Sequence, residues 1–83
     1  MRRLPPPTPG EILLYEFLEP MGLSARELAD AMGVPEDDVT ELLDGRRVID
    51  IDLNRRLCDY FGMSDRFWIS LQHAYDRRMQ NQS

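Results

Sequence analysis

The fold is decided by residues 23–47, which read LSARELADAMGVPEDDVTELLDGRR. Ser24, with Glu27 three residues later, is a capping box, so a helix is predicted to begin there. Gly33 is predicted to end that helix, because glycine adopts a left-handed C-terminal conformation without steric cost. Pro35 suits the first turn of a second helix, where a missing N–H matters least. The stretch therefore predicts two short helices joined by a tight turn.

The apolar residues of this stretch have helical spacing and form two facing stripes: Leu28, Ala29 and Met32 on the first helix, and Val39, Leu42 and Leu43 on the second. Two such helices joined by a glycine-containing turn make a helix-turn-helix over residues 24–44, whose second helix normally enters the major groove of DNA. The same local pattern also fits an ordinary pair of core helices.

Size and composition indicate one small globular domain. The chain has 83 residues, of which 42% are hydrophobic, too many for a disordered segment. Its single cysteine, Cys58, excludes an intrachain disulfide framework, so we expect a cytoplasmic protein. No apolar run approaches the ~18 residues that a membrane span needs, and no signal peptide is visible, so we expect no membrane partner.

The charge of the chain is unusual for a DNA-binding domain. Fifteen acids face ten arginines and no lysine, which gives a net charge of −5. Residues 34–47, the predicted second helix and its exit, contain five acids and two arginines and therefore carry −3. DNA-binding domains are usually basic, because phosphate neutralisation supplies most of their non-specific affinity. An acidic chain can still bind DNA where its arginines gather on one face.

Before this stretch, residues 1–9 form a proline-rich lead-in that we expect to be extended. Thr8, Pro9, Gly10 and Glu11 then start a helix that is predicted to run to about Leu18, where Pro20–Gly22 breaks it. Its predicted buried side consists of Ile12, Leu13, Phe17 and Leu18.

After the stretch, Asp50 or Asp52 can cap a fourth helix that Gly62 ends, and Ser64 opens a fifth helix over residues 64–79. No β-alternation persists anywhere. Five helices with short links predict an all-α bundle, with residues 10–80 as one domain.

The fifth helix carries a wide apolar stripe with two interpretations. It can pack into the core against the first helix, or part of it can form a homodimer surface, since aromatic residues are favoured at interfaces. A second copy would also help a domain of this size and would double its DNA contacts. The residues predicted for that surface are Trp68, Leu71, Tyr75 and Met79.

Catalytic chemistry is hard to build from this sequence. His73 is the only histidine, no Cys/His pair has metal-ligand spacing, and no two carboxylates stand out as an acid–base pair. The acidic run 36–38 suits a helix N-terminus, where the dipole favours negative charge. We expect no enzymatic activity, metal, cofactor or small-molecule substrate.

Three groups of residues carry a family resemblance: TPGEIL at 8–13 with EFLEPMGLS at 16–24; ELA at 27–29, GV at 33–34 and LLDGRR at 42–47; and FWISLQ at 67–72 with AYDR at 74–77. With them the chain resembles, over nearly its whole length, the HigA-type (VapI-like) antitoxins of the XRE helix-turn-helix family. The resemblance implies a lambda-repressor-like five-helix fold. It further implies a dimeric repressor of its own operon that binds and neutralises a cognate toxin, usually a basic RelE-like mRNA endonuclease of the HigB type.

The residues predicted to contact double-stranded operator DNA lie at the two helix N-termini, one turn further along the second helix, and after it: Arg26, Pro35, Glu36, Asp37, Thr40, Glu41, Arg46 and Arg47. In this interpretation carboxylates accept hydrogen bonds from cytosine amino groups, while backbone N–H groups and arginines hold phosphates. The chain departs from the family in having Thr8 in place of a histidine, Ala25 in place of a polar residue, and an acidic second helix. Two alternatives remain: a module that neutralises a toxin or another partner without reading DNA, and a stand-alone phage-type regulator.

Overall fold

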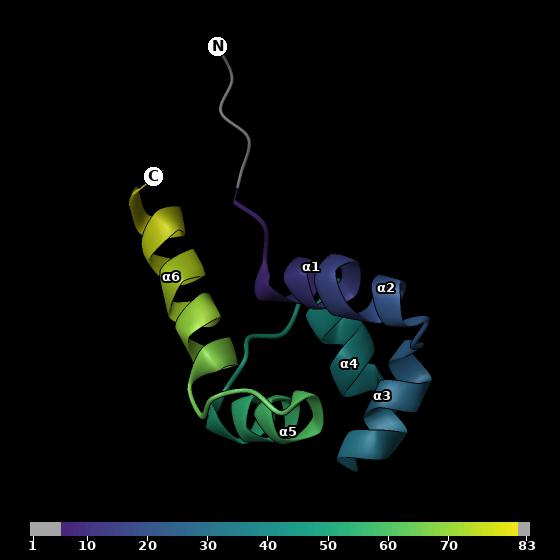
Figure 1. Ribbon diagram of the computed structural model, residues 1–83. Helices are drawn as coiled ribbons and strands as arrows, with labels where there is room; N and C mark the ends of the chain where they lie inside the picture. The colour runs from purple at the N-terminus through teal and green to yellow at the C-terminus, as the bar shows by residue number, and fades with distance from the viewer. Residues whose placement is uncertain (1–5, 82–83) are drawn as a thin grey trace.

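The computed structural model of the chain describes residues 6–81, and all regular secondary structure in that range is helical (Figure 1). The elements are α1 (Pro9–Leu13), η1 (Leu14–Leu18), α2 (Glu19–Met21), α3 (Ala25–Met32), α4 (Glu36–Leu43), α5 (Ile51–Phe61) and α6 (Phe67–Asn81). Because α1, η1 and α2 follow one another without a gap, the described range holds five helices, which confirms the predicted all-α fold. None of them is long and apolar enough to cross a membrane. The segment predicted to be extended falls partly outside the described range, and Pro9 already belongs to α1.

The first helix begins with a capping box and continues through a proline. The Thr8 hydroxyl accepts a hydrogen bond from the Glu11 N–H at 3.1 Å, and the Glu11 carboxylate accepts one from the Thr8 N–H at 3.0 Å. The helix extends past its predicted end at about Leu18 and ends at Gly22, the last residue of the predicted break, whose φ is 64°. Proline cannot donate to the carbonyl four residues earlier, and the preceding turn is widened into the π-helical segment η1, where such bonds are not required.

Trp68 lies at the centre of the core, with 0% of its surface exposed. Its ring centroid is 5.1 Å from that of Phe17, 5.2 Å from that of Phe67 and 6.2 Å from that of Phe61. The aromatic stripe of α6 therefore packs on the first helix and on α5, as the core interpretation predicted. The prediction that Trp68 lies on a dimer surface is wrong, because packing within one chain already covers it completely.

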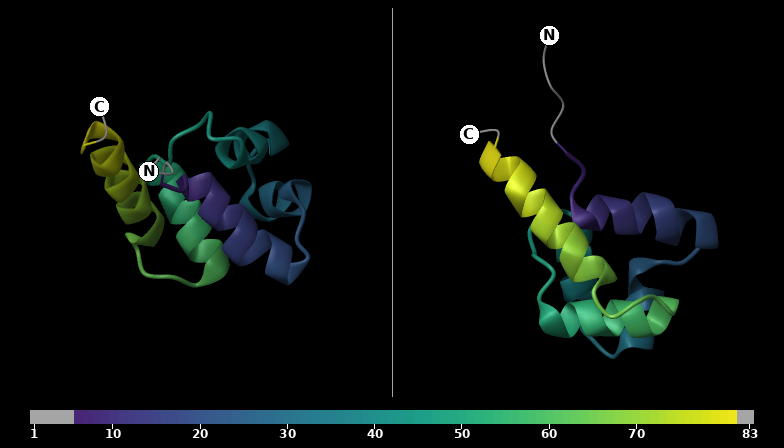
Figure 2. Two further views of the ribbon diagram at one scale, coloured as in Figure 1. Left: turned by 90° about the horizontal axis from the view of Figure 1, so that it is seen from above. Right: turned by 60° about the vertical axis from the view of Figure 1, so that its left-hand side comes forward.

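The other three residues predicted for the dimer surface remain partly or largely accessible. Leu71 and Tyr75 are half-buried, and Met79 is 40% exposed. Helix α6 stands at one side of the molecule and the α3–α4 unit at the other (Figures 1 and 2). The end of α6 around Met79 therefore lies away from the helix-turn-helix.

Two buried amides join α5, α6 and the connector before α5. Asn54 donates from Nδ2 to the Asp65 carbonyl at 2.6 Å and accepts from the Ile69 N–H at 2.9 Å. Gln72 accepts from the Ile49 N–H at 2.9 Å. The turn around Asp65 explains why α6 begins at Phe67 and not at the predicted Ser64. No sequence pattern predicted a structural role for either amide.

Helix α1 crosses the end of α4 at very short range. A Cβ atom added to Gly10 would lie 1.8 Å from the Leu42 carbonyl oxygen and 3.0 Å from the Cα of Leu43. Gly10 is therefore required by the close approach of two backbones, and this approach fixes the position of the second helix of the helix-turn-helix.

Candidate nucleic-acid interface

Helix α3 begins and ends as the sequence predicted. The Ser24 hydroxyl accepts from the Glu27 N–H at 3.0 Å, and the Glu27 carboxylate accepts from the Ser24 N–H at 2.9 Å. The Ser24 N–H, which donates to the carboxylate, and to a smaller extent the Ser24 hydroxyl beside it lower the pKa of Glu27 below its usual value of 4.5. Gly33 ends the helix with φ of 73°, a conformation that costs other residues free energy. The chain then turns directly into α4.

Helix α4 has an open N-terminus. Pro35 is its N-cap, one position earlier than predicted, and within residues 6–81 no side chain caps this helix, whereas Thr8, Ser24 and Asp50 cap α1, α3 and α5. Glu36 and Asp37 are exposed in the first turn, where negative charge interacts favourably with the helix dipole.

Thr40 and Glu41, one turn further along α4, are both half-buried. The Thr40 hydroxyl donates to the carbonyl of Asp37 at 3.2 Å, so it bonds back onto its own helix. A phosphate, which can only accept, would have to replace that local bond, whereas a base amino group could donate to the hydroxyl oxygen while the bond remains.

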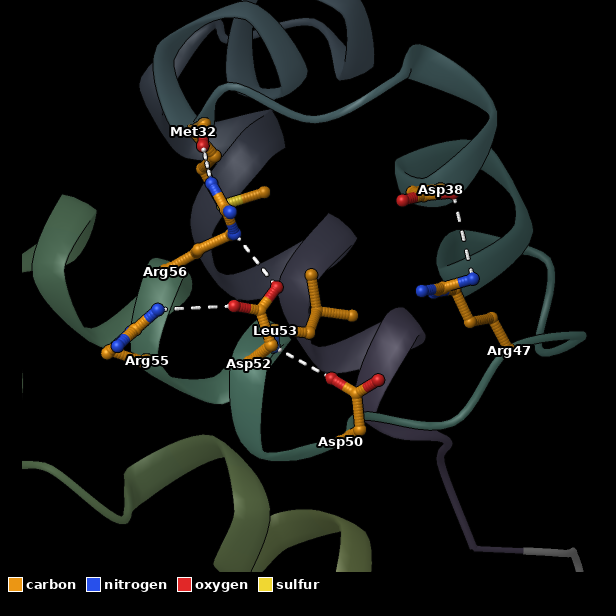
Figure 3. Close-up of polar contacts among 8 residues, drawn as sticks. All are labelled: Met32, Asp38, Arg47, Asp50, Asp52, Leu53, Arg55 and Arg56. Carbon is orange, nitrogen blue, oxygen red and sulfur yellow. Dashed lines mark hydrogen bonds and ion pairs between the residues drawn. The ribbon is translucent and has the colours of Figure 1, made fainter.

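The predicted DNA-contacting arginines differ in their surroundings. Arg26 is exposed in the first turn of α3. Arg46 is exposed and pairs with Asp44 at 3.1 Å, whereas Arg47 reaches from the connector back to the first turn of α4, where Nη1 lies 3.6 Å from the Asp38 carboxylate (Figure 3). The two arginines after α4 are therefore both engaged by acids of this helix and its end. Asp38 belongs to the acidic run noted in the sequence, but no local pattern indicated its contact with Arg47.

A second arginine cluster supports the helix-turn-helix from α5. Arg56 donates to the carbonyl of Met32, at the end of α3, at 2.6 Å and to Asp52 at 2.9 Å, and Arg55 pairs with Asp52 at 3.3 Å (Figure 3). The hydrogen bond from Arg56 lowers the pKa of Asp52. The spacing of Asp52 and Arg56 in the sequence could have indicated their pairing, but nothing local indicates the bond to Met32.

This arrangement makes the chain a helix-turn-helix protein, and comparison with known proteins defines the class further. No family model matches the chain. It is 45% identical over 74 residues to virulence-associated protein I of Dichelobacter nodosus, covering 89% of this chain and 68% of that protein. It is 41% identical over 71 residues to antitoxin HigA-1 of Vibrio cholerae, covering 86% and 67%.

A solved structure agrees with these relatives. The Pseudomonas aeruginosa antitoxin HigA, solved with the higBA promoter, is 37% identical and matches with a TM-score of 0.86 over 90% of this chain and 82% of that one. The chain belongs to the HigA-type antitoxin family. It spans about two thirds of the length of the curated relatives named above.

Proposed function

We propose that the chain is the antitoxin of a type II toxin–antitoxin module and represses its own operon by binding operator DNA as a dimer. The observation that carries this proposal is the α3–Gly33–α4 unit with the uncapped N-terminus of α4, in a chain related to an antitoxin solved with promoter DNA. A helix N-terminus offers backbone N–H groups to a phosphate, and α4 is short enough to lie in the major groove.

An acidic helix can still read bases in this arrangement. Glu36 and Glu41 can accept hydrogen bonds from cytosine amino groups, which few other side chains recognise as well. Arg26, Arg46 and Arg47 then supply the phosphate contacts that fix the helix in the groove. The dimer would form through the accessible end of α6 and would present two α4 helices to the two half-sites of an operator.

The partner protein in this proposal is a basic RelE-like mRNA endonuclease of the HigB type. An endonuclease that attracts RNA phosphate carries positive charge, and the net charge of −5 on this chain is complementary to it. The antitoxin would act by binding and would have no catalytic role of its own.

A second candidate function is neutralisation of the toxin without DNA binding. It is favoured by the ion pairs that engage Arg46 and Arg47 and by the net charge of −3 in residues 34–47. Under this alternative the helix-turn-helix retains its fold while its acidic surface serves the protein partner.

One salt-titrated binding experiment separates the two functions. The full chain is titrated with a duplex from the upstream region of its own operon and with a scrambled duplex of equal length. We expect preference for the upstream duplex, and we expect Glu36→Gln to shift the preferred base by about 1–3 kcal/mol, because an amide suits adenine better. If the wild type shows no preference at about 50 mM salt, where phosphate contacts are strong, the repressor function is wrong.

The toxin and the dimer are tested separately. Co-expression with the basic protein of the adjacent reading frame should yield a complex at low salt, and failure to co-purify would remove the antitoxin function. Light scattering should show a dimer, whereas a monomer well above micromolar concentration would contradict the proposed symmetry.

A further inference from the structure

The contact between Asp38 and Arg47 differs from the other ion pairs of the described residues. Its charged atoms are 3.6 Å apart, whereas the other three pairs lie at 2.9–3.3 Å. Its side chains are also the least accessible, with 34% of Arg47 and 28% of Asp38 exposed, against 67% and 60% for Arg46 and Asp44. Arg47 is thus held in a partly buried position by a charge contact that is longer than a good hydrogen bond.

The guanidinium of Arg47 is also incompletely satisfied. Its Nε atom is buried and has no hydrogen-bond partner among the residues that the structure describes. Buried N–H groups normally find a partner, and a guanidinium can donate two parallel hydrogen bonds to an anion. In its present position Arg47 uses little of that capacity.

We infer that Asp38 restrains Arg47, so that DNA binding requires a phosphate to replace this carboxylate as the partner of the arginine. Asp38 is then a positioning residue that limits the affinity for DNA. The inference rests on the proposed DNA-binding function and adds a residue that the predicted DNA-contacting set does not contain.

The backbone next to Arg47 is anchored, so the exchange would have to be made by the side chain. Ile49, two residues after Arg47, is buried, and its N–H is bound by Gln72 of α6 at 2.9 Å. The connector is therefore anchored next to Arg47, and only the side chain needs to turn from Asp38 to a phosphate. Asp38 remains in the first turn of α4 after the exchange, where the helix dipole stabilises its charge.

A double-mutant cycle in DNA affinity tests the inference. The dissociation constant of the full chain is measured for the wild type, Asp38→Asn, Arg47→Ala and the double variant, on the upstream duplex and on the scrambled duplex. We expect Asp38→Asn to tighten binding about 3-fold more in the presence of Arg47 than in the Arg47→Ala background, the ratio that corresponds to a partly exposed ion pair. The ratio should be the same on both duplexes, because a phosphate contact carries no sequence information.

Two further cycles control for charge and for pairing. Asp37→Asn removes the same charge one residue away, and its effect should not depend on Arg47. Asp44→Asn combined with Arg46→Ala tests an ion pair that is open to solvent, and its ratio should be close to 1. Asp38→Ser provides a second substitution in case Asp38→Asn perturbs α4, and thermal unfolding verifies that each variant is folded.

The outcomes distinguish this inference from the function on which it rests. A ratio of 1 at Asp38 and Arg47, or weaker binding by Asp38→Asn, would overturn the inference alone, since Asp38 would then be irrelevant or would support Arg47 in the complex. If the wild type binds neither duplex, the proposed DNA-binding function is wrong, and this inference is wrong with it.

Discussion

The polar side chains at the junction of α5 and α6 differ from those on the surface of α4 in burial and in the partners they bind. At the junction, the amides of Asn54 and Gln72 are buried and bonded at 2.6–3.0 Å to backbone groups and to Asp76. At α4, several carboxylates lie near the surface and two arginines pair with them, and one of these pairs is largely exposed. Buried hydrogen bonds are costly to break, whereas exposed ion pairs contribute about 0–1 kcal/mol and exchange easily. We therefore expect substitutions at the α5–α6 junction to change stability, and substitutions on the surface of α4 to change DNA binding.

The largest loss of stability is expected where backbone meets backbone. Gly10→Ala would place a methyl group against the Leu42 carbonyl and force α1 away from α4, at a cost of about 3 kcal/mol or more. Urea unfolding followed by circular dichroism measures this loss. Gly22→Ala is the matched control, because nothing lies within 4 Å of its added Cβ and only its φ of 64° is unfavourable, at about 1 kcal/mol. Equal losses for the two variants would contradict the close approach.

The next largest effect is expected at the buried amide of α5. Asn54→Leu leaves the Ile69 N–H and the Asp65 carbonyl without their partner, and each unsatisfied buried group costs about 1–3 kcal/mol. We expect the free energy of unfolding to fall by at least about 2 kcal/mol. Asn54→Asp keeps the acceptor for Ile69 but loses the donor to Asp65, so its loss should be intermediate. If Asn54→Leu were as stable as the wild type, the hydrogen bonds of Asn54 would not contribute to the stability of the α5–α6 junction.

The sequence predicted local features of the fold better than contacts between distant residues. The capping box of Ser24 and the turn at Gly33 were predicted, and Asp50 was one of two predicted caps of α5, because each feature depends on residues within one helical turn. The roles of Asn54 and Gln72 were missed because their partners lie 11 to 23 residues away. The helix extends past the predicted end at about Leu18 because the π-helical turn before Pro20 accommodates the proline, and no sequence pattern predicted that turn.

The candidate site shows the same limit. The sequence predicted the helix-turn-helix and the acidic character of α4, which follow from local pattern and composition. It could not show that Arg47 turns back to Asp38, nine positions earlier, because that contact depends on the path of the connector. Nor could it separate the core part of α6 from its accessible end, because Trp68 and Met79 belong to the same predicted stripe and only packing distinguishes them.

A smaller effect is expected at the cap of α3. Ser24→Ala removes the hydroxyl that accepts from the Glu27 N–H, and loss of such a cap costs about 1 kcal/mol near neutral pH. Thermal unfolding of the wild type and the variant measures the difference. Ser24→Thr keeps the hydroxyl and should recover most of the stability. An unchanged melting temperature for Ser24→Ala would show that packing alone holds α3 in place.

The partner of this cap makes the stability depend on pH. The pKa of Glu27 is lower in the folded chain than its usual 4.5, so its ionised form stabilises the fold above that value, and this contribution is lost as the pH falls through the folded pKa. Glu27→Gln keeps a hydrogen-bonding side chain but does not titrate. We therefore expect the wild type to be the more stable of the two above about pH 4.5 and the difference to shrink in acid. A difference that stayed constant from pH 7 to pH 3 would contradict this assignment.

The smallest effect on stability is expected at Arg46. A substitution there should weaken DNA binding while leaving the free energy of unfolding almost unchanged. Its pair with Asp44 is 67% and 60% exposed, so Arg46→Ala should change the free energy of unfolding by less than about 0.5 kcal/mol. The same variant should weaken binding to the upstream and scrambled duplexes about equally. It should also make the negative slope of log affinity against log salt shallower by about 1, because one phosphate contact disappears. Arg66→Ala, an exposed arginine between α5 and α6, is the control for net charge and should leave that slope nearly unchanged. If Arg46→Ala lowered stability but not the salt slope, this arginine would belong with the structural contacts of the α5–α6 junction and not with the exchangeable charges that α4 presents to DNA.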